Sequence, residues 1–573
     1  MSVAAARLAL PAGQTRLANQ RTHSLLVARW RLIFLLLGLL VAGLVLLLRI
    51  AWLGVVQPSP AQMTMAEALL PARGEIADRN GVPLARAFPA RALWFNPEAM
   101  GDGGSALVRP VAEVAAELTA IFPDLDASAM ERRLSSGQSG YIRRRVLPAD
   151  ADKVQALGEL ALELPSERDR FYPQGSMAAH VLGYVAADGH GRVGMEAVLD
   201  EQLLDPARRG TPSALSIDVR VQGALEDQLR QGMLAVDALG AAGIVLDVDT
   251  GEVLALASLP EFDPNAIDAV GQERMFNRVT NQVYELGSTF KTLTVAAAID
   301  SGAVTSLSKR YPAQPFKVGG FTIKDSRSKG ATLNVPEMLI HSSNVVTAHL
   351  VDATGPAVLQ KYMRELGMAE RPYIELPARG FPIWSSGEWP RLRAMTVGYG
   401  HGIAVTPLHL ASAYATMVNG GIWRPATLHK LGPGEAPKGR RVFKASTSAR
   451  MNQLMRMITL YGTGRNADAP GFRVGGKTGS AEKPSNGGYA RTTLVSTFAA
   501  AFPMDRPRYV VIIMLDEPKG TVRSSFQRTA AWNAAPVVAR LVPRIGPMLG
   551  VKPDSTRDID LTDLKPLVRG GAE

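Results

Sequence analysis

The stretch that begins the decisive helix is Glu285-Leu286-Gly287-Ser288-Thr289-Phe290-Lys291, and the apolar residues after Ser288 have the spacing of a helix that packs one face inward. The glycine before Ser288 permits a sharp turn, which would place this serine at the helix N-terminus, where free N–H groups favour developing negative charge. Lys291 follows three residues later and therefore lies on the same helix face. A serine hydroxyl needs a base to become nucleophilic, and a desolvated lysine near other cations can serve as that base. The stretch predicts a serine nucleophile activated by a lysine.

Ser-x-x-Lys by itself is weak evidence, because the same spacing occurs three more times, from Ser306, Ser326 and Ser480. Two later elements distinguish the copy at Ser288, and they are Ser342-Ser343-Asn344 and Lys477-Thr478-Gly479-Ser480. Ser-x-x-Lys, Ser-x-Asn and Lys-Thr-Gly together form the signature of penicillin-binding proteins and class A β-lactamases. The elements lie far apart in the sequence, so we expect the fold to bring them together.

Composition limits the other kinds of chemistry. The 573 residues include no cysteine, which excludes disulfides, cysteine-ligated metals and a thiol nucleophile. The eight histidines show no paired spacing typical of metal ligands, so we expect neither a metal nor another cofactor. The net charge is +11, of which five positive charges are arginines within residues 1–31, where there is no acid. The rest of the chain is only modestly basic, which disfavours a nucleic-acid groove and suits an anionic membrane or wall polymer.

Residues 32–56 are predicted to form a transmembrane anchor. The chain carries no charge from Leu32 to Leu48, and after Arg49 it is again apolar to Val56. The arginine-rich residues 1–31 predict a cytoplasmic tail and export of everything after the anchor. A cleavable signal peptide is the alternative, but the long apolar stretch without a clear Ala-x-Ala site favours an uncleaved anchor.

Residues 57–225 are predicted to form an elongated mixed pedestal domain, the first part of an α+β protein. Residues 73–81, 170–175 and 194–196 include arginines and acidic residues, which we expect to make buried ion pairs that hold this platform together. Asn80-Gly81 is a hairpin turn signal. Two stretches, 113–122 and 152–164, have the spacing of amphipathic helices.

Residues 226–545 are predicted to form the catalytic domain, an antiparallel sheet flanked by helices. Two strands are expected early, at 244–246 and 253–256, and three late, at 474–482, 494–502 and 509–515, with a helical middle and a closing helix at 527–541. The sheet would therefore be assembled from both ends of the domain. Gly479 would lie on one of these strands and permit the close approach of a ligand. Residues 546–573 are expected to be a C-terminal tail, polar and mobile from residue 554.

With these elements placed, the chain resembles the class B penicillin-binding proteins, most closely the cell-division D,D-transpeptidases of the penicillin-binding protein 3 type. The likeness extends from the anchor to the end of the catalytic domain, and outside the trio it is carried by residues 73–81, 170–175, 247–255, 277–278, 398–402 and 405–408. Residues 497–518 are similar to the division branch of the family rather than the elongation branch. Leu286 stands where the family usually has proline, and Ser480 where threonine is commoner. Class A is disfavoured, because no glycosyltransferase motif is evident.

The resemblance implies a catalytic set of Ser288, Lys291 and Ser342. Ser288 would attack the penultimate D-Ala of a peptidoglycan stem peptide, with Lys291 as the base and Ser342 passing a proton to the leaving amine. An amine from a neighbouring stem would then attack the acyl-enzyme and form the cross-link. β-Lactam antibiotics would acylate the same serine.

The resemblance also implies a substrate-binding set, made up of Asn344, Lys477, Thr478, Gly479 and Ser480. Asn344 would hold the amide of the acyl chain, and Lys477 would add positive charge that keeps the base partly deprotonated. The hydroxyls of Thr478 and Ser480 would bind the terminal carboxylate of the substrate.

Cell location and partners also follow from the resemblance. It implies a single-pass protein of the bacterial inner membrane, with the catalytic domain in the periplasm, that acts in septal wall synthesis. The expected partners are a membrane-embedded glycan polymerase of the SEDS family and other division proteins.

Three alternative functions remain: a serine β-lactamase, a β-lactam sensor and a non-catalytic division scaffold. A class A β-lactamase needs a glutamate between its second and third motifs, and no Glu-x-x-Leu-Asn occurs between Ser342 and Lys477. A sensor would need a cytoplasmic effector, for which residues 1–31 are too short. A scaffold would not need the lysines.

Overall fold

The computed structural model describes residues 29–47, 49, 73–99, 107–186, 188–485 and 488–568. The chain divides into two units, Met1–Leu70 and Pro71–Glu573. In the first, the helix Arg29–Leu47 has 19 residues, and an 18-residue window within it has a mean hydropathy of 2.5, so by length and composition it is able to cross a membrane. Residues 1–28 of the expected cytoplasmic tail, and residues 48 and 50–56 of the expected anchor, lie outside the described residues.

The second unit is built around a five-stranded antiparallel sheet. Its order is β15 (Gly475–Ser485), β16 (Gly488–Phe502), β17 (Tyr509–Asp516), β7 (Gly240–Asp247) and β8 (Val253–Leu259). The two early strands pair with the late ones through β7 and β17, where Ile512 lies opposite Ile244. The expected sheet, assembled from both ends of the domain, is confirmed, and β15 lies at its edge.

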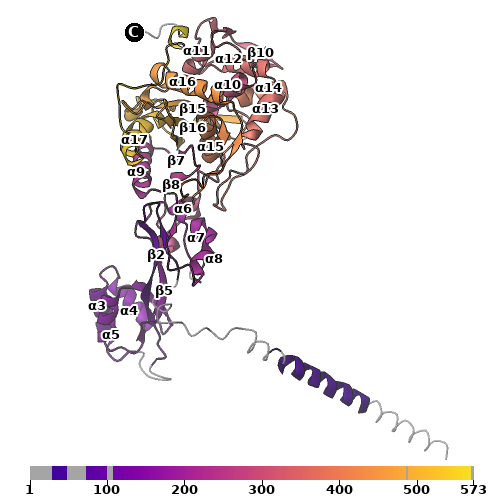
Figure 1. Cartoon of the computed structure of the whole chain (residues 1–573). Helices are drawn as coiled ribbons and strands as arrows, with labels where there is room; N and C mark the ends of the chain where they lie inside the picture. The colour runs from indigo at the N-terminus through magenta and orange to yellow at the C-terminus, as the bar shows by residue number, and fades with distance from the viewer. Residues whose placement is uncertain are drawn as a thin grey trace, which may run out of the picture. The chain divides into compact units, whose positions relative to one another are not determined.

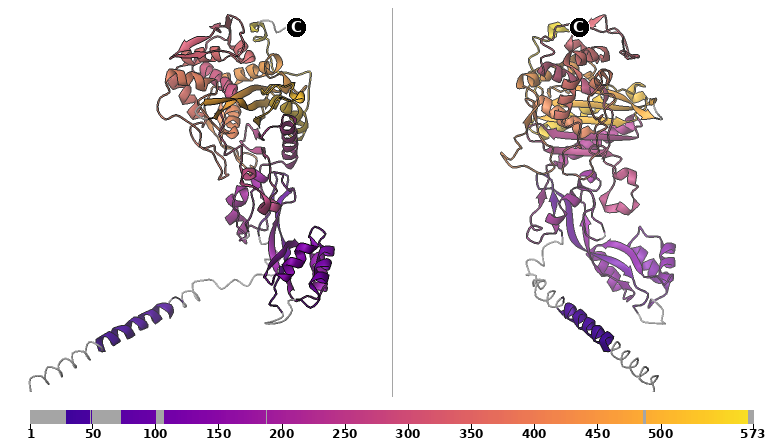
Figure 2. Two further views of the ribbon diagram at one scale, coloured as in Figure 1. Left: turned by 180° about the vertical axis from the view of Figure 1, so that it is seen from behind. Right: turned by 90° about the vertical axis from the view of Figure 1, so that its right-hand side faces the viewer.

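Helices cover both faces of this sheet. Along β17, Val510, Ile512 and Met514 face one core cluster, while the residues between them face a second. The second cluster is closed by α9 (Val219–Ala235) and α17 (Ala534–Met548), which lie beside each other in Figure 1. Because both faces are buried, the strand is continuously apolar rather than alternating. Figure 2 shows the helices on either side of the sheet from two further directions.

The helices of the other face deliver the motif residues. They are α10 (Phe290–Asp300), α11 (Val335–His341), α12 (Asn344–Thr354), α13 (Pro356–Glu365), α14 (Arg391–Gly398), α15 (Pro407–Val418) and α16 (Ala445–Tyr461). The sequence predicted one buried face for α10. The helix is instead buried on nearly every side, because α12, α13, α14, α15 and α16 all pack against it. Short two-stranded pairs connect these helices: β9 (Tyr311–Pro312) with β12 (Thr332–Leu333), β10 (Phe316–Val318) with β11 (Phe321–Ile323), and β13 (Ile422–Trp423) with β14 (Arg440–Arg441).

The N-terminal part of this unit has two hydrophobic cores. The long strand β2 (Pro83–Phe95) pairs along its length with β1 (Ile76–Ala77), β5 (Ser166–Phe171), β3 (Gly140–Val146) and β4 (Leu162–Glu163), as Figure 1 shows for β2 and β5. One end packs with α3 (Val111–Ile121), α4 (Ala127–Ser135) and α5 (Pro148–Ala156) around a core of its own. The other end, with β6 (Ser213–Ala214), α6 (Ala179–Leu182), α7 (Gly194–Val198) and α8 (Asp200–Leu204), shares the core of the catalytic part.

Local predictions for this region are partly confirmed. Gly81 has φ of +86° in the turn between β1 and β2, as the hairpin signal predicted. Glu196 is fully buried between Arg73 at 2.8 Å and Arg170 at 2.6 Å, which confirms the expected ion pairs. The helix expected at 152–164 is wrong in extent, because α5 ends at Ala156 and its continuation becomes β4. The expected domain boundary between residues 225 and 226 falls inside α9, which packs on the sheet.

The C-terminal tail is a correction. Helix α17 starts at Ala534, later than predicted, and after it the chain was expected to be a mobile tail. Residues 554–568, which we term the C-terminal strap, instead pack on the catalytic domain and end in a short 3₁₀ turn, Lys565–Leu567. Leu561 and Leu564 on the strap are 4% and 1% exposed and belong to the main core cluster. Two buried leucines in a polar sequence explain both why the strap docks and why composition alone missed it.

Candidate active site

The turn before α10 carries Ser288 and is held in place by close backbone contacts. Gly287 has φ of +55°, and a Cβ there would come within 2.8 Å of the carbonyl oxygen of Ser480. Gly287 also donates its N–H to the carbonyl of Gly400 at 3.2 Å, and Gly402 donates to Glu285 Oε1 at 2.9 Å. The serine turn is therefore fixed between β15 and the turn that follows α14. The sharp turn predicted at Gly287 is present, and Ser288 lies just before the first turn of α10.

Lys291 is the second residue of α10 and is fully buried. Its ammonium group donates to the backbone carbonyl of Ser342 at 2.5 Å and lies 3.1 Å from the Ser342 hydroxyl oxygen. Lys477 on β15 is also fully buried and donates to the same Ser342 hydroxyl at 3.0 Å. The predicted base, proton carrier and second lysine thus meet at one oxygen atom.

Ser288 itself is partly exposed, as a group that meets a substrate must be. Within the described residues its hydroxyl makes no hydrogen bond. Hydrogen bonds between a nucleophile and its base are often long without substrate and tighten in the complex. The separation by one helical turn, with Lys291 held from behind by Ser342, leaves the serine hydroxyl free to rotate toward either the base or a carbonyl carbon.

The Ser-x-Asn element forms the junction between α11 and α12. Ser342 ends α11 in a left-handed conformation, with φ of +60° and ψ of +46°, which turns its carbonyl and hydroxyl toward the lysines. Ser343 caps α12 by accepting the N–H of Val346 at 3.1 Å. Asn344 is half-buried and lies at the start of α12, where its amide is 3.5 Å from the carbonyl of Lys324.

Asp325 is a site residue that the sequence reasoning missed. Its carboxylate accepts hydrogen bonds from the Ser343 hydroxyl at 2.6 Å, from the Asn344 N–H at 2.5 Å and from the Val345 N–H at 3.2 Å. A carboxylate at a helix N-terminus is stabilising. It therefore holds the Ser-x-Asn element in position, although the loop that carries it, Lys324-Asp325-Ser326-Arg327-Ser328, resembles an ordinary polar loop.

Hydrogen bonds to neighbouring groups of the protein hold the motif residues of β15 in position. Lys477 donates to its neighbour Thr478, at 2.9 Å to the carbonyl and 3.2 Å to the hydroxyl, and that hydroxyl is 2.8 Å from the hydroxyl of Thr463. Thr463 was not predicted. The Ser480 hydroxyl accepts the N–H of Ala530 at 3.1 Å, which leaves its own proton to donate.

Gly479 is also required as glycine by a contact within the chain that the sequence did not predict. A Cβ at this position would come within 2.3 Å of the carbonyl oxygen of Leu286 and 2.8 Å of the Thr289 side chain. The close approach is that of the chain's own serine turn, not only that of a ligand. The glycines at 287 and 479 together let the backbones of Ser288 and Ser480 lie side by side.

Burial controls the charge of the two lysines. Desolvation lowers the pKa of Lys291 to about 7, and the nearby Asp325 carboxylate acts in the opposite direction. Burial lowers the pKa of Lys477 well below its ordinary value, and the charge of Lys291 lowers it further. Two ammonium groups on one hydroxyl repel each other, so a neutral amine is available near neutral pH.

The chain matches the models of two protein domain families. Residues 241–541 match the penicillin binding protein transpeptidase domain, and residues 68–232 match the penicillin-binding protein dimerisation domain. The chain is 38% identical to the probable peptidoglycan D,D-transpeptidase FtsI of Caulobacter vibrioides over 497 residues, which is 85% of this chain and 83% of that protein. It is 29% identical to the peptidoglycan D,D-transpeptidase FtsI of Escherichia coli over 567 residues, 94% and 95% of the two chains.

Solved structures agree in fold. The chain is similar to the crystal structure of penicillin binding protein 3 from Mycobacterium tuberculosis complexed with aztreonam. The match covers 86% of this chain and 99% of that one, with a TM-score of 0.65 and 25% identity. The same protein with ampicillin covers 85% and 97%, with a TM-score of 0.66 and 25% identity.

The lowered lysine pKa predicts the pH dependence of the reaction at Ser288. A base is active when neutral, so acylation by a β-lactam such as ampicillin should rise with pH through about 7 and then level off. In Asp325→Asn the carboxylate no longer stabilises the ammonium form of Lys291, so the rise should shift to lower pH. The measurement is the acylation rate constant of the full chain in detergent between pH 5 and pH 9, roughly spanning this pKa.

Asn at position 325 keeps an oxygen that accepts from the Asn344 N–H, so the change removes charge more than shape. Asp352→Asn, at a partly exposed carboxylate paired with Arg391 on α14, is the matched control and should leave the profile unchanged. A pH profile that is flat across this range, or that moves upward in Asp325→Asn, would contradict the assignment of Lys291 as the base.

Proposed function

Because the chain belongs to the class B penicillin-binding proteins, we propose that Ser288 is the nucleophile with which it cross-links peptidoglycan. It is a peptidoglycan D,D-transpeptidase of the cell-division type, and β-lactams are its inhibitors. The observation that carries the residue assignment is the meeting of Lys291 and Lys477 on the hydroxyl of Ser342, one helical turn from Ser288.

The first half of the reaction forms the acyl-enzyme. Neutral Lys291 takes the proton of the Ser288 hydroxyl, whose oxygen attacks the carbonyl carbon of the penultimate D-Ala. The tetrahedral intermediate then collapses, the peptide bond to the terminal D-Ala breaks, and the leaving amine receives a proton from the Ser342 hydroxyl. Ser342 regains its proton from the lysines that contact it, so the proton taken from Ser288 ends on the departing D-Ala.

The second half reverses these steps with a different amine. The amine of a neighbouring stem peptide attacks the acyl carbon, its proton passes to the Ser342–lysine group, and the new amide bond forms as the ester bond to Ser288 breaks. Ser288 recovers its proton from Lys291, which returns the site to its starting state. A β-lactam forms the same ester, but its leaving group stays tethered, so the adduct persists.

Substrate binding falls to the strand edge and the start of α12. The backbone N–H groups of Ser288 and Ser480 form the oxyanion hole. The close approach of the two backbones at Gly287 and Ser480 supports this assignment. Losing one such donor typically costs about 2.7–4 kcal/mol. The hydroxyls of Thr478 and Ser480 bind the terminal carboxylate, with Lys477 supplying positive charge nearby. Asn344 binds the amide of the acyl chain.

Covalent labelling tests this function against its alternatives. The full chain in detergent should form one stable adduct with a fluorescent penicillin, located at Ser288 by mass spectrometry, and Ser288→Ala should abolish it. Ser306→Ala, in another Ser-x-x-Lys sequence, is the matched control and should label normally. Rapid loss of the adduct with release of hydrolysed drug would indicate a β-lactamase, and a chain that never labels would indicate a scaffold.

We also propose a membrane orientation. The protein is membrane-anchored, with the helix Arg29–Leu47 as the candidate span. The arginines that precede the span favour an N-terminus in the cytoplasm and a catalytic domain in the periplasm, where its substrate is assembled into wall.

Protease treatment of spheroplasts tests the orientation. Protease added outside should digest residues 73–568 and spare an N-terminal tag, which should become sensitive only after lysis. Digestion of the tag with protection of the catalytic domain would contradict the proposed orientation.

A glycan polymerase of the SEDS family and other division proteins are the proposed partners. The matched families cover a dimerisation domain and a transpeptidase domain, so the glycan strands that the enzyme cross-links must be polymerised by another active site. Contact is expected through residues 32–56 and 62–225. A tagged full chain should co-purify with the polymerase from detergent-solubilised membranes, and a chain with both segments replaced by unrelated ones should not. Co-purification that survives both replacements would contradict this arrangement.

A further inference from the structure

The C-terminal strap reaches two of the three elements that form the active site. We propose that residues 554–568 position β15 and α11, and with them Lys477 and Ser342, for catalysis. This inference rests on the proposed function, because it concerns the geometry of the same site. In Figure 1 the yellow 3₁₀ turn Lys565–Leu567 of the strap lies near α11, above the sheet that contains β15.

The first contact lies just before β15. Asp554 donates its N–H to the carbonyl of Gly471 at 2.9 Å, and Arg473 donates back to the carbonyl of Asp554 at 3.3 Å. Arg473 is 5% exposed and adopts φ of +52°, so its conformation is held by its surroundings. Its guanidinium pairs with Asp505 at 2.7 Å, and Arg557 of the strap pairs with the same carboxylate at 2.5 Å. The strap is thus bonded to residues 471 and 473, which lead directly into β15, and to Asp505, the partner of Arg473.

The second contact passes through Arg456 on α16, whose side chain is 7% exposed. Its guanidinium meets both carboxylate oxygens of Asp558 on the strap, with distances of 2.7 Å to 3.0 Å. The same group donates to the carbonyl of Val474 at 2.8 Å and to Asp468 at 2.7 Å. Val474 is three residues from Lys477, so Asp558 orients the arginine that holds the start of the strand.

The third contact is at the other end of the strap. Asn334 is the N-cap of α11, where its side-chain oxygen accepts the N–H of Glu337 at 3.0 Å. Its side-chain nitrogen donates to the carbonyl of Leu567 at 2.6 Å. Helix α11 ends one residue before Ser342, so this bond joins the strap to the helix that delivers the shared hydroxyl.

Burial shows that these are the contacts of a docked segment rather than of a loose end. Leu561 and Leu564 of the strap belong to the same core cluster as Leu339 and Ile340 of α11. Gln453 of α16 donates to the carbonyl of Asp560, the residue just before Leu561, at 2.7 Å. Packing, ion pairs and backbone bonds therefore act together along the strap, and displacing it would release both β15 and α11.

Loosening the strap should affect the lysines in a particular direction. If the start of β15 moves, water gains access to Lys477 and Lys291, and the desolvation that lowers their pKa values decreases. The base would then need a higher pH to become neutral. A displacement of about 1 Å in a catalytic group is enough to slow a reaction by roughly a hundred-fold. A segment that only stabilised the fold would change neither the pH profile nor the rate per folded molecule.

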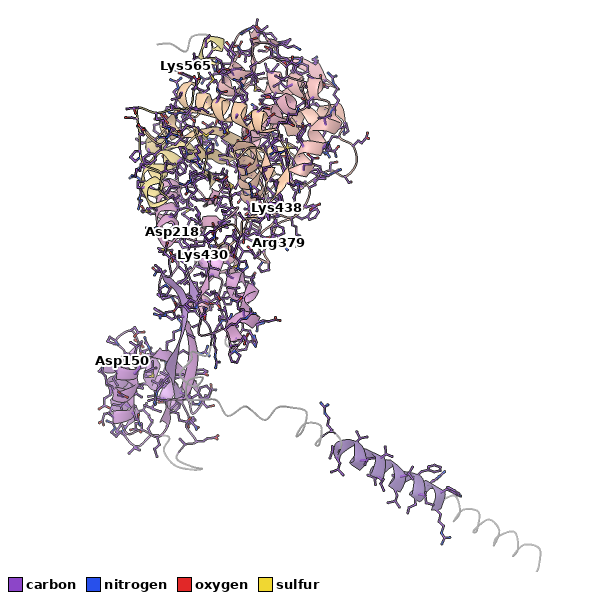
Figure 3. The ribbon with its side chains drawn as sticks, in the orientation of Figure 1. Asp150, Asp218, Arg379, Lys430, Lys438 and Lys565 are labelled. Carbon is purple, nitrogen blue, oxygen red and sulfur yellow. The ribbon has the colours of Figure 1, made fainter. Side chains whose placement is uncertain are left out.

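The experiment measures penicillin acylation per folded molecule in the full chain, with the folded fraction taken from thermal denaturation. Asp558→Ala removes the partner of Arg456, and a second variant ends the chain after residue 553. Lys565→Ala is the matched control on the strap, because Lys565 is an exposed side chain, labelled in Figure 3. We expect Asp558→Ala to react about ten- to a hundred-fold more slowly and its pH profile to shift to higher pH, while the control matches the parent chain.

The outcomes are distinguishable. A slower reaction with an upward-shifted profile in Asp558→Ala supports the inference, as does the same result in the shortened chain where that chain folds. Parent-like rates and profiles in Asp558→Ala overturn it, and so does a slower reaction that is fully explained by a smaller folded fraction with an unchanged profile. Failure of the parent chain itself to form an adduct would instead overturn the proposed function.

Discussion

Two buried ammonium groups share one hydroxyl oxygen, and the rest of the structure depends on that arrangement. Lys291 and Lys477 come from a helix and an edge strand, and both are fully buried at Ser342. Burying two like charges this close is unfavourable, so at least one amine becomes neutral and basic. The hydrophobic cores on both faces of the sheet supply the free energy that keeps these lysines buried. Catalysis uses the result, which is a lysine with a lowered pKa.

The architecture brings the three elements together through backbone contacts rather than through long side chains. Glycines at 287, 400 and 479 allow the serine turn, the turn after α14 and β15 to touch. Ser342 adopts a left-handed conformation at the end of α11, and Asp325 holds the following helix by its N-terminus. Neighbouring segments thus hold the backbone at each catalytic residue in place, which is the condition for a preorganised site.

The sequence predicted those parts that depend on local pattern. The trio identified the residues that meet, and apolar strands predicted the sheet. The arginines and acidic residues of three short pedestal motifs predicted the buried Glu196 pairs. Asp325, Thr463 and the C-terminal strap were missed, because each acts through a contact between segments far apart in the sequence. A polar tail resembles any other polar tail until the core that its two leucines join is known. Residues 152–164 change from helix to strand because β2 offers a partner.

The most direct test of the shared-hydroxyl site is a titration of the lysine side chains themselves. Lysine ¹⁵N resonances of the full chain in detergent, assigned with Lys291→Met and Lys477→Met, report each pKa separately from the reaction. The account predicts that Lys291 titrates near 7 and that Lys477 also titrates well below the surface lysines. If both lysines titrate together with the surface lysines at about 10.4, the two groups are solvated and charged, and the account is wrong.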